Sequence, residues 1–231
     1  MESSSLRSAG RLFFDEKAHS YSLDGEIVPS VTRIAHYKKN SFRFVKKDTL
    51  ENAKQRGTLV HDAIRLSLHG VLDELSLPEE ILPYFYAFKN FMEDFKPQPI
   101  LIEQPICSFK YRYAGMLDLF ASISSGYVLV DWKTGAAVPE YNSQAGGYLQ
   151  ALMEVWPDEK EISRIMDSRI IFCHLTKNGR YNTVEYYPLD SLVSWFGQLS
   201  FYRKSKGGNF EFDGTQQTVE NEAGRGAIPD D

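Results

Sequence analysis

The sequence predicts an α/β fold in which a central mixed β-sheet is flanked by helices. Three apolar segments rich in strand-forming residues follow one another between residues 99 and 133, and short turn-like stretches separate them. Segments with helical spacing of apolar residues lie before and after these strands. A further apolar strand follows the second helical segment, so at least one strand pair is expected to be joined through a helix.

Length and composition favour one soluble globular unit. The chain has 231 residues, of which 42% are hydrophobic and 25% charged. We expect a single domain over residues 9–204, made of an N-terminal hairpin and helical part (11–96) and a core (97–190), preceded by a flexible stretch at 1–8. Residues 205–231 are Gly-rich and polar, and we expect them to be disordered.

The N-terminal part predicts a hairpin followed by helices. Residues 11–28 are expected to form two short strands joined by the turn Asp24-Gly25. Ser30 then has the character of a helix N-cap, and a long helix is expected at about 48–69, ended by Gly70. The pattern Ser76-Leu-Pro-Glu79 resembles a capping box for the next helix, although Pro83 should kink or delay its start.

The second half predicts the sheet. Three antiparallel strands are expected between residues 99 and 133, then a helix over 140–156 that ends at Pro157. A buried strand at 169–176, an Asn178-Gly179 turn, a partner strand at 182–187 and a last helix at 189–204 complete the elements.

Turn positions fix which residues face each other across these strands. A hairpin that turns between Ser124 and Ser125 places Asp118 opposite Asp131. Directly opposed side chains lie roughly 5 Å apart at Cβ and project from the same face. Lys133 follows Asp131 by two residues and therefore projects from that face too.

The preceding hairpin adds a third carboxylate to this face. If it turns between Lys110 and Tyr111, Glu103 lies opposite Asp118. Carboxylates packed together destabilise a protein unless something compensates their charge, and a divalent cation bound by oxygen ligands, Mg²⁺ or Mn²⁺, does so. The alternative is a carboxylate–lysine ion-pair cluster on an exposed sheet face.

Basic residues gather within residues 38–56 although the net charge is −5. Aromatic side chains are interleaved with them, a mixture that suits phosphates and bases but is also found on a solvated helix face. The basic residues in this stretch are Lys38, Lys39, Arg43, Lys46, Lys47, Lys54 and Arg56.

Five motifs together resemble those of the PD-(D/E)XK nuclease superfamily, in particular its RecB-like exonuclease branch. They are GMLD at 115–118, DWKTG at 131–135, RGTLVH at 56–61, Glu103 and QAGGY at 144–148. The segment HSYSLDGEIVPSVT at 19–32 is similar to the opening of phage-encoded members.

The resemblance implies that the sheet and its helices form a restriction-endonuclease-like core. It also implies a metal-dependent deoxyribonuclease, an exonuclease rather than an endonuclease, that uses Mg²⁺, accepts Mn²⁺ and leaves 5′-phosphates. Its metal ligands would be His61, Asp118, Asp131 and the backbone carbonyl of Trp132, with Glu103 helping to hold a second ion. Lys133 would be the catalytic lysine, and Gln144 and Tyr148 would orient it and contact DNA. Further DNA contacts would come from the basic residues Arg43, Lys46, Lys47, Lys54 and Arg56.

The resemblance also carries expectations about context. DNA would be the partner, together with a single-strand annealing or single-strand-binding protein, in the cytoplasm of a bacterium or phage-infected cell and without a membrane. The cysteines Cys107 and Cys173 are expected to be buried thiols and are too few for the four-cysteine iron–sulfur cluster of some relatives. A catalytically inactive DNA-binding or assembly module, a structure-specific endonuclease and a hydrolase of small phosphoesters remain as alternatives.

Overall fold

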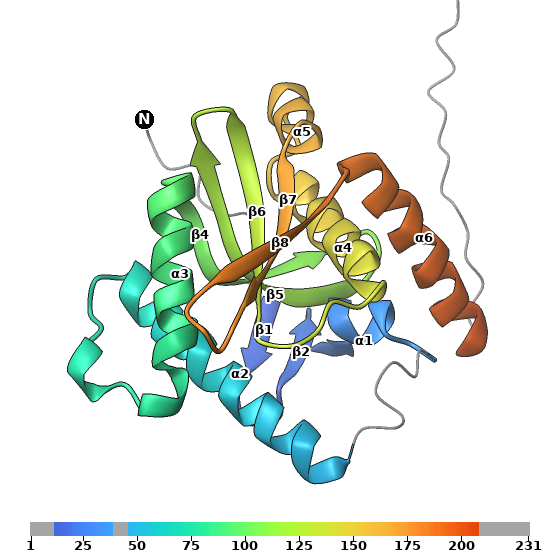
Figure 1. Ribbon diagram of the computed structural model, residues 1–231. Helices are drawn as coiled ribbons and strands as arrows, with labels where there is room; N and C mark the ends of the chain where they lie inside the picture. The colour runs from blue at the N-terminus through green and yellow to red at the C-terminus, as the bar shows by residue number, and fades with distance from the viewer. Residues whose placement is uncertain (1–11, 39–45, 208–231) are drawn as a thin grey trace, which may run out of the picture.

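The computed structural model describes residues 12–38 and 46–207, and its architecture confirms the predicted fold class. A five-stranded mixed sheet is flanked by helices on both faces, and a small three-stranded antiparallel sheet packs beside it (Figure 1). The expected flexible N-terminus at 1–8, Arg43 and residues 208–231 of the expected tail lie outside the described residues.

The N-terminal sheet contains three strands where the sequence predicted two. They are β1 (Leu12–Asp15), β2 (Ser20–Leu23) and β3 (Glu26–Val28). The predicted turn between β2 and β3 is confirmed, with φ angles of 53° at Asp24 and 83° at Gly25. The prediction missed a second turn, in which the Asp15 carboxylate accepts a hydrogen bond from the amide of Ala18 at 3.0 Å, so the first expected strand is divided.

The N-terminal helices begin and end largely where the sequence indicates. Ser30 caps α1 (Val31–Ala35) by accepting a hydrogen bond from the Arg33 amide at 3.0 Å. The long helix α2 spans Lys47–Leu68 and is followed by Gly70 at a φ of 70°.

The helix expected from Ser76 begins later. Ser76 instead ends a 3₁₀ helix, η1 (Glu74–Ser76), which Asp73 caps, and a second one, η2 (Glu79–Ile81), follows. Helix α3 (Leu82–Phe95) then starts with Pro83 in its first turn, where the missing amide hydrogen costs nothing. The capping-box prediction was therefore wrong, whereas the delay attributed to Pro83 is confirmed.

The main sheet has the order β4-β5-β6-β7-β8, from β4 (Gln98–Ser108), β5 (Tyr113–Ile123), β6 (Gly126–Lys133), β7 (Arg169–Leu175) and β8 (Tyr181–Tyr186). Only the β6–β7 pair within it is parallel. The predicted registers are confirmed, because Leu119 pairs with Val130 in one hairpin and Gln104 pairs with Leu117 in the other. Both hairpins therefore turn where the sequence indicated.

The helix that follows β6 is α4 (Glu140–Val155), as expected. The sequence analysis missed α5 (Glu159–Met166), whose N-cap Asp158 accepts hydrogen bonds from the amides of Lys160 and Glu161. The last helix, α6 (Pro188–Ser205), continues one residue into the stretch assigned to the tail.

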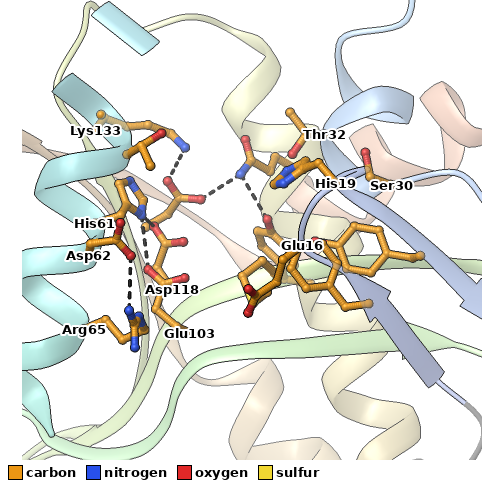
Figure 2. A pocket seen from close by; sticks show the side chains of 18 of the residues that line it. Glu16, His19, Ser30, Thr32, His61, Asp62, Arg65, Glu103, Asp118 and Lys133 are labelled. Carbon is orange, nitrogen blue, oxygen red and sulfur yellow. Dashed lines mark hydrogen bonds and ion pairs between the residues drawn. The ribbon is translucent and has the colours of Figure 1, made fainter. Parts of the chain in front are cut away.

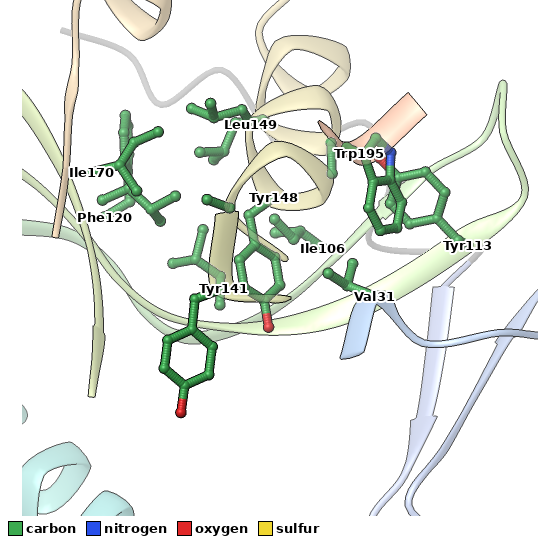
Figure 3. Packing of buried hydrophobic residues seen from close by; sticks show 14 of the residues in the cluster. Val31, Ile106, Tyr113, Phe120, Tyr141, Tyr148, Leu149, Ile170 and Trp195 are labelled. Carbon is green, nitrogen blue, oxygen red and sulfur yellow. The ribbon is translucent and has the colours of Figure 1, made fainter. Parts of the chain in front are cut away.

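Each face of the main sheet has its own core. One face packs against α2 and α3 through buried residues that include Val128, Val130 and Trp132. The opposite face packs against α4 and α6, and Figure 3 shows Val31, Tyr113 and Trp195 gathered beside α4. Cys107 and Cys173 are both buried and form no disulfide within the described residues, as expected.

The close approach of α4 to α6 depends on a glycine. A Cβ atom at Gly146 would lie 2.0 Å from the carbonyl oxygen of Ser191, closer than any Cβ can sit.

Within the described residues, no helix combines the length and apolar character needed to cross a membrane.

Candidate active site

A cavity of about 1150 Å³ lies where the small sheet meets the main sheet. Strands β4, β5 and β6 form its floor, α2 forms one wall, and α1 with β1 and β2 forms the wall across from it (Figure 2). The candidate site residues that line it are His61, Glu103, Asp118, Asp131, Lys133, Gln144 and Tyr148.

His61 reaches from α2 toward two of the carboxylates. Its Nδ1 atom lies 3.2 Å from Oε1 of Glu103 and 3.6 Å from Oδ2 of Asp118. One ligand atom from each of these three residues lies within 4.8 Å of the other two, a spacing that suits a shared metal ion. Glu103, expected to assist with a second ion, therefore lies in the same group of possible ligands as His61 and Asp118.

The other ring nitrogen of His61 determines the state of this group. Nε2 lies 3.0 Å from the carbonyl oxygen of Trp132, which can only accept, so Nε2 carries a proton. In neutral His61 the lone pair of Nδ1 therefore faces two carboxylates, which repel it unless a proton or a cation intervenes. The Trp132 carbonyl, expected to be a direct metal ligand, is here the acceptor that orients the histidine.

Protonation is the response of the protein without a metal. Burial alone would lower the pKa of His61, but the charge of Asp118 and the hydrogen bond and charge of Glu103 outweigh it and raise the pKa to about 9. The pKa of Asp118 is raised, chiefly by burial. These three residues form a site that holds positive charge.

Asp131 belongs to a neighbouring set of contacts. Its Oδ1 atom accepts a hydrogen bond of 2.7 Å from Nε2 of Gln144, and its Oδ2 atom forms an ion pair with Nζ of Lys133. Burial, with 3% of the residue exposed, raises the pKa of Asp131 to about 6. The link to Asp118 runs through the backbone, because the Trp132 amide donates to Oδ2 of Asp118 at 2.8 Å.

Lys133 projects into the cavity between its acid partner and two aromatic rings. Its Nζ atom lies 5.0 Å from the ring centre of Tyr141 and 5.4 Å from that of Phe172, distances of cation–π contacts. Burial would lower the pKa of Lys133, but the charges of Asp131 and Asp118 outweigh it and raise the pKa. The amine is therefore an ammonium at neutral pH.

Gln144 and Tyr148 stand one turn apart on α4, as their spacing predicts. Nε2 of Gln144 donates to the hydroxyl of Tyr148 at 3.3 Å as well as to Asp131, and each residue is 3% exposed. Both side chains are therefore held in place where α4 lines the cavity.

The basic residues proposed to contact DNA lie in different surroundings. Lys54 lines the cavity and is exposed, and Lys46 is exposed at the start of α2. Arg56 is turned inward, where Nη2 donates to the Thr134 carbonyl at 3.4 Å and the guanidinium lies 5.4 Å from the ring centre of Tyr84. Lys47 begins α2, but its side chain, like Arg43, lies outside the described part of the chain.

Several lining residues were not singled out from the sequence. Phe14 and Tyr21 come from β1 and β2 and His19 from the turn between them, while Arg33 lies on α1 and His36 is its C-cap. The motif at 19–32 indicated that this segment is characteristic, but only the packing of the small sheet against β4 and β5 brings it to the cavity.

No protein-family model and no curated protein matches this sequence. The fold is similar to the crystal structure of SSO0001, with 15% identity and a TM-score of 0.31 over 68% of this chain and 74% of that one. It is also similar to an alkaline exonuclease, LHK-Exo, from Laribacter hongkongensis, with 12% identity and a TM-score of 0.33 over 77% of this chain and 92% of that one.

Proposed function

We propose that this protein is a divalent-metal-dependent deoxyribonuclease that hydrolyses phosphodiester bonds from DNA ends. The observation that carries the proposal is the convergence of His61, Glu103 and Asp118 within 4.8 Å, beside an ammonium at Lys133. The five motifs that resemble the RecB-like branch support it, because they supply every one of these residues.

The donor set fits a divalent cation. Two carboxylates and one imidazole offer oxygen and nitrogen donors, and the Nδ1 lone pair of His61 is directed at the carboxylates by the Trp132 carbonyl. Mg²⁺ prefers the oxygens, and Mn²⁺ also accepts the nitrogen, so Mn²⁺ should substitute. A bound cation would lower the pKa of a coordinated water and neutralise charge on the phosphate.

Lys133 would act on the phosphate through its charge. Because the neighbouring acids raise its pKa, it is a poor general base and a good stabiliser of negative charge that grows on the phosphate oxygens. Asp131 holds the ammonium in place, and Gln144 holds Asp131. The lysine thus reaches the reaction from a fixed position, which reduces the reorganisation needed.

The proposal extends to an exonuclease that produces 5′-phosphates during DNA recombination or repair, as the resemblance implies. The deciding experiment incubates end-labelled linear DNA and covalently closed circular DNA with Mg²⁺, with Mn²⁺ and with EDTA. We expect shortened linear products with either cation, intact circles, and no products in EDTA. Cleavage of circles would replace the exonuclease with an endonuclease.

Two variants separate a nuclease from an inactive DNA-binding module. Lys133→Ala and Asp131→Ala should abolish cleavage, while Lys133→Ala should leave DNA binding largely intact. Equal loss of cleavage and binding in Lys133→Ala would contradict the assigned role. If the unmodified protein cleaved none of the tested DNA substrates in the presence of a divalent metal, the proposed function would be contradicted altogether.

A further inference from the structure

Three aromatic side chains form one wall of the cavity, here called the aromatic wall: Phe14, His19 and Tyr21. Phe14 and Tyr21 are register partners on β1 and β2, and their rings stack with centroids 4.7 Å apart. The His19 ring meets Phe14 edge-on at 5.5 Å. The wall runs from buried Tyr21 to exposed His19, so its outer part is open to a ligand.

The inner end of this wall lies beside the proposed metal ligands. The charges of Glu103 and Asp118 both act on the Tyr21 hydroxyl, and all three residues line the same cavity. Figure 2 shows His19 and Glu16 across the cavity from His61 and Asp62. A nucleotide whose phosphate reaches the carboxylates would therefore carry its base along Phe14 and His19.

The charged residues that line the cavity favour the same orientation of the nucleotide. The cavity-lining residues of the β1–β2 hairpin include the acid Glu16 and no lysine or arginine. The α2 wall across from it contributes Lys54 together with Arg65 and Asp62, which form an ion pair at 3.2 Å, and α1 adds Arg33 beside the hairpin. Lys54 and the ammonium of Lys133 are thus expected to hold the phosphates away from Glu16, which leaves the bases directed at the aromatic wall.

We propose that Phe14 and His19 form a stacking subsite for one unpaired nucleobase next to the phosphate that is cleaved. Inside a duplex, both faces of a base are covered by its neighbours and its edge by its partner, so we expect the base that stacks here, while its phosphate occupies the site, to be unpaired. The inference rests on the proposed nuclease function and names its substrate class as single-stranded DNA, or a single-stranded end.

An abasic scan tests the subsite without altering the protein. Single-stranded oligonucleotides of one sequence, each with one abasic residue at a successive position, are cleaved with Mg²⁺ and compared at each bond. Base–aromatic stacking is worth enough for a loss on the order of tenfold in kcat/KM. We expect that loss when the abasic residue directly adjoins the cleaved bond. Uniform cleavage at all positions would overturn the proposal.

Phe14→Leu and its matched control attribute the effect to the wall. Phe14→Leu removes the ring but keeps an apolar side chain in the core of the small sheet. The control, Phe13→Leu, alters the neighbouring residue, whose side chain is on the other face of β1 and which is 65% exposed. We expect Phe14→Leu to lower kcat/KM on single strands about tenfold and to abolish the abasic effect. Phe13→Leu should resemble the unmodified protein; a Phe14→Leu protein that retains the full abasic effect would contradict the assignment.

Duplex DNA and a non-catalytic readout complete the test. The unmodified protein should cleave a single strand at least about tenfold faster than the blunt duplex of the same sequence. In EDTA, an oligonucleotide that carries 2-aminopurine should lose fluorescence on binding to the unmodified protein and much less on binding to His19→Ala. Metal-dependent cleavage with equal rates on both DNA forms refutes the subsite alone, whereas no cleavage of any DNA refutes the proposed function.

Discussion

The Nδ1–H group of His174 donates a hydrogen bond of 2.8 Å to the carbonyl oxygen of Gly135. His174 is the register partner of Lys133 on the neighbouring parallel strand, and it is 92% buried, with 8% exposed. Arg56 donates to the preceding carbonyl, that of Thr134. Side chains from β7 and α2 therefore fix the two residues that directly follow Lys133.

His174 should thus position the lysine without touching the DNA. His174→Asn keeps a nitrogen donor near the Nδ1 position, whereas His174→Gln places its amide near Nε2 and His174→Leu offers no donor. Displacement of a catalytic group by a fraction of an ångström is costly, so we expect His174→Leu to lower kcat roughly 10- to 100-fold with the KM for DNA unchanged. His174→Asn should recover most of the activity and His174→Gln little of it. Equal activity of the three variants in single-turnover assays would exclude a positioning role.

Gly146 limits how closely α4 can approach α6. Because a Cβ at this position would lie 2.0 Å from the Ser191 carbonyl oxygen, Gly146→Ala must separate the two helices. We expect a loss of about 3 kcal/mol in the free energy of unfolding, or roughly 10 °C in Tm.

Gly197 on α6 is the matched control for Gly146. No atom lies within 4 Å of its added Cβ, so Gly197→Ala should stabilise the helix by about 0.5–1 kcal/mol. Urea denaturation of both variants provides the measurement, and an unchanged midpoint for Gly146→Ala would show that the helices adjust at no cost.

The sequence predicts features of this structure that are set by neighbouring residues. The register of β5 against β6 follows from a turn at Ser124 and Ser125, and a hairpin turn determines every pair that follows it. The shared face of Asp118, Asp131 and Lys133 could therefore be derived from short-range signals alone.

Features that depend on distant contacts could not be derived in this way. The sequence assigned Arg56 to DNA, yet its guanidinium is turned to Thr134, which is 78 positions away along the chain. The aromatic wall is similarly hidden, because the placement of Phe14 depends on how the small sheet packs against β4 and β5. The separation of the carboxylates into two sets was also not predicted. Asp131 contacts Gln144 and Lys133. The other two carboxylates group with His61.

Gln144 should matter more to the reaction than its hydrogen-bond partner Tyr148. Gln144→Leu leaves Oδ1 of Asp131 buried without its hydrogen-bond donor. A hydrogen bond to a charged acceptor contributes about 1.5–3 kcal/mol, and this contribution would be lost. We expect Asp131 to turn, the lysine to move with it, and kcat to fall on the order of 100-fold. Tyr148→Phe removes only an acceptor from Gln144, and kcat should fall less than about tenfold. A larger effect on KM in Tyr148→Phe would indicate that the hydroxyl contacts DNA directly.

His61 should give the metal-free protein a characteristic dependence of stability on pH. Its pKa is raised from 6.5 to about 9, so the folded state binds a proton that the unfolded chain releases. This stabilisation is fully present below pH 6.5 and is lost as the pH rises through about 9. In EDTA, the Tm of the unmodified protein should therefore fall over this window relative to that of His61→Asn, which has no proton to lose. A saturating divalent cation should remove most of the difference, because it takes the place of the proton between Nδ1 and the two carboxylates. Parallel Tm curves for the two proteins in EDTA would show that Glu103 and Asp118 do not retain a charged histidine.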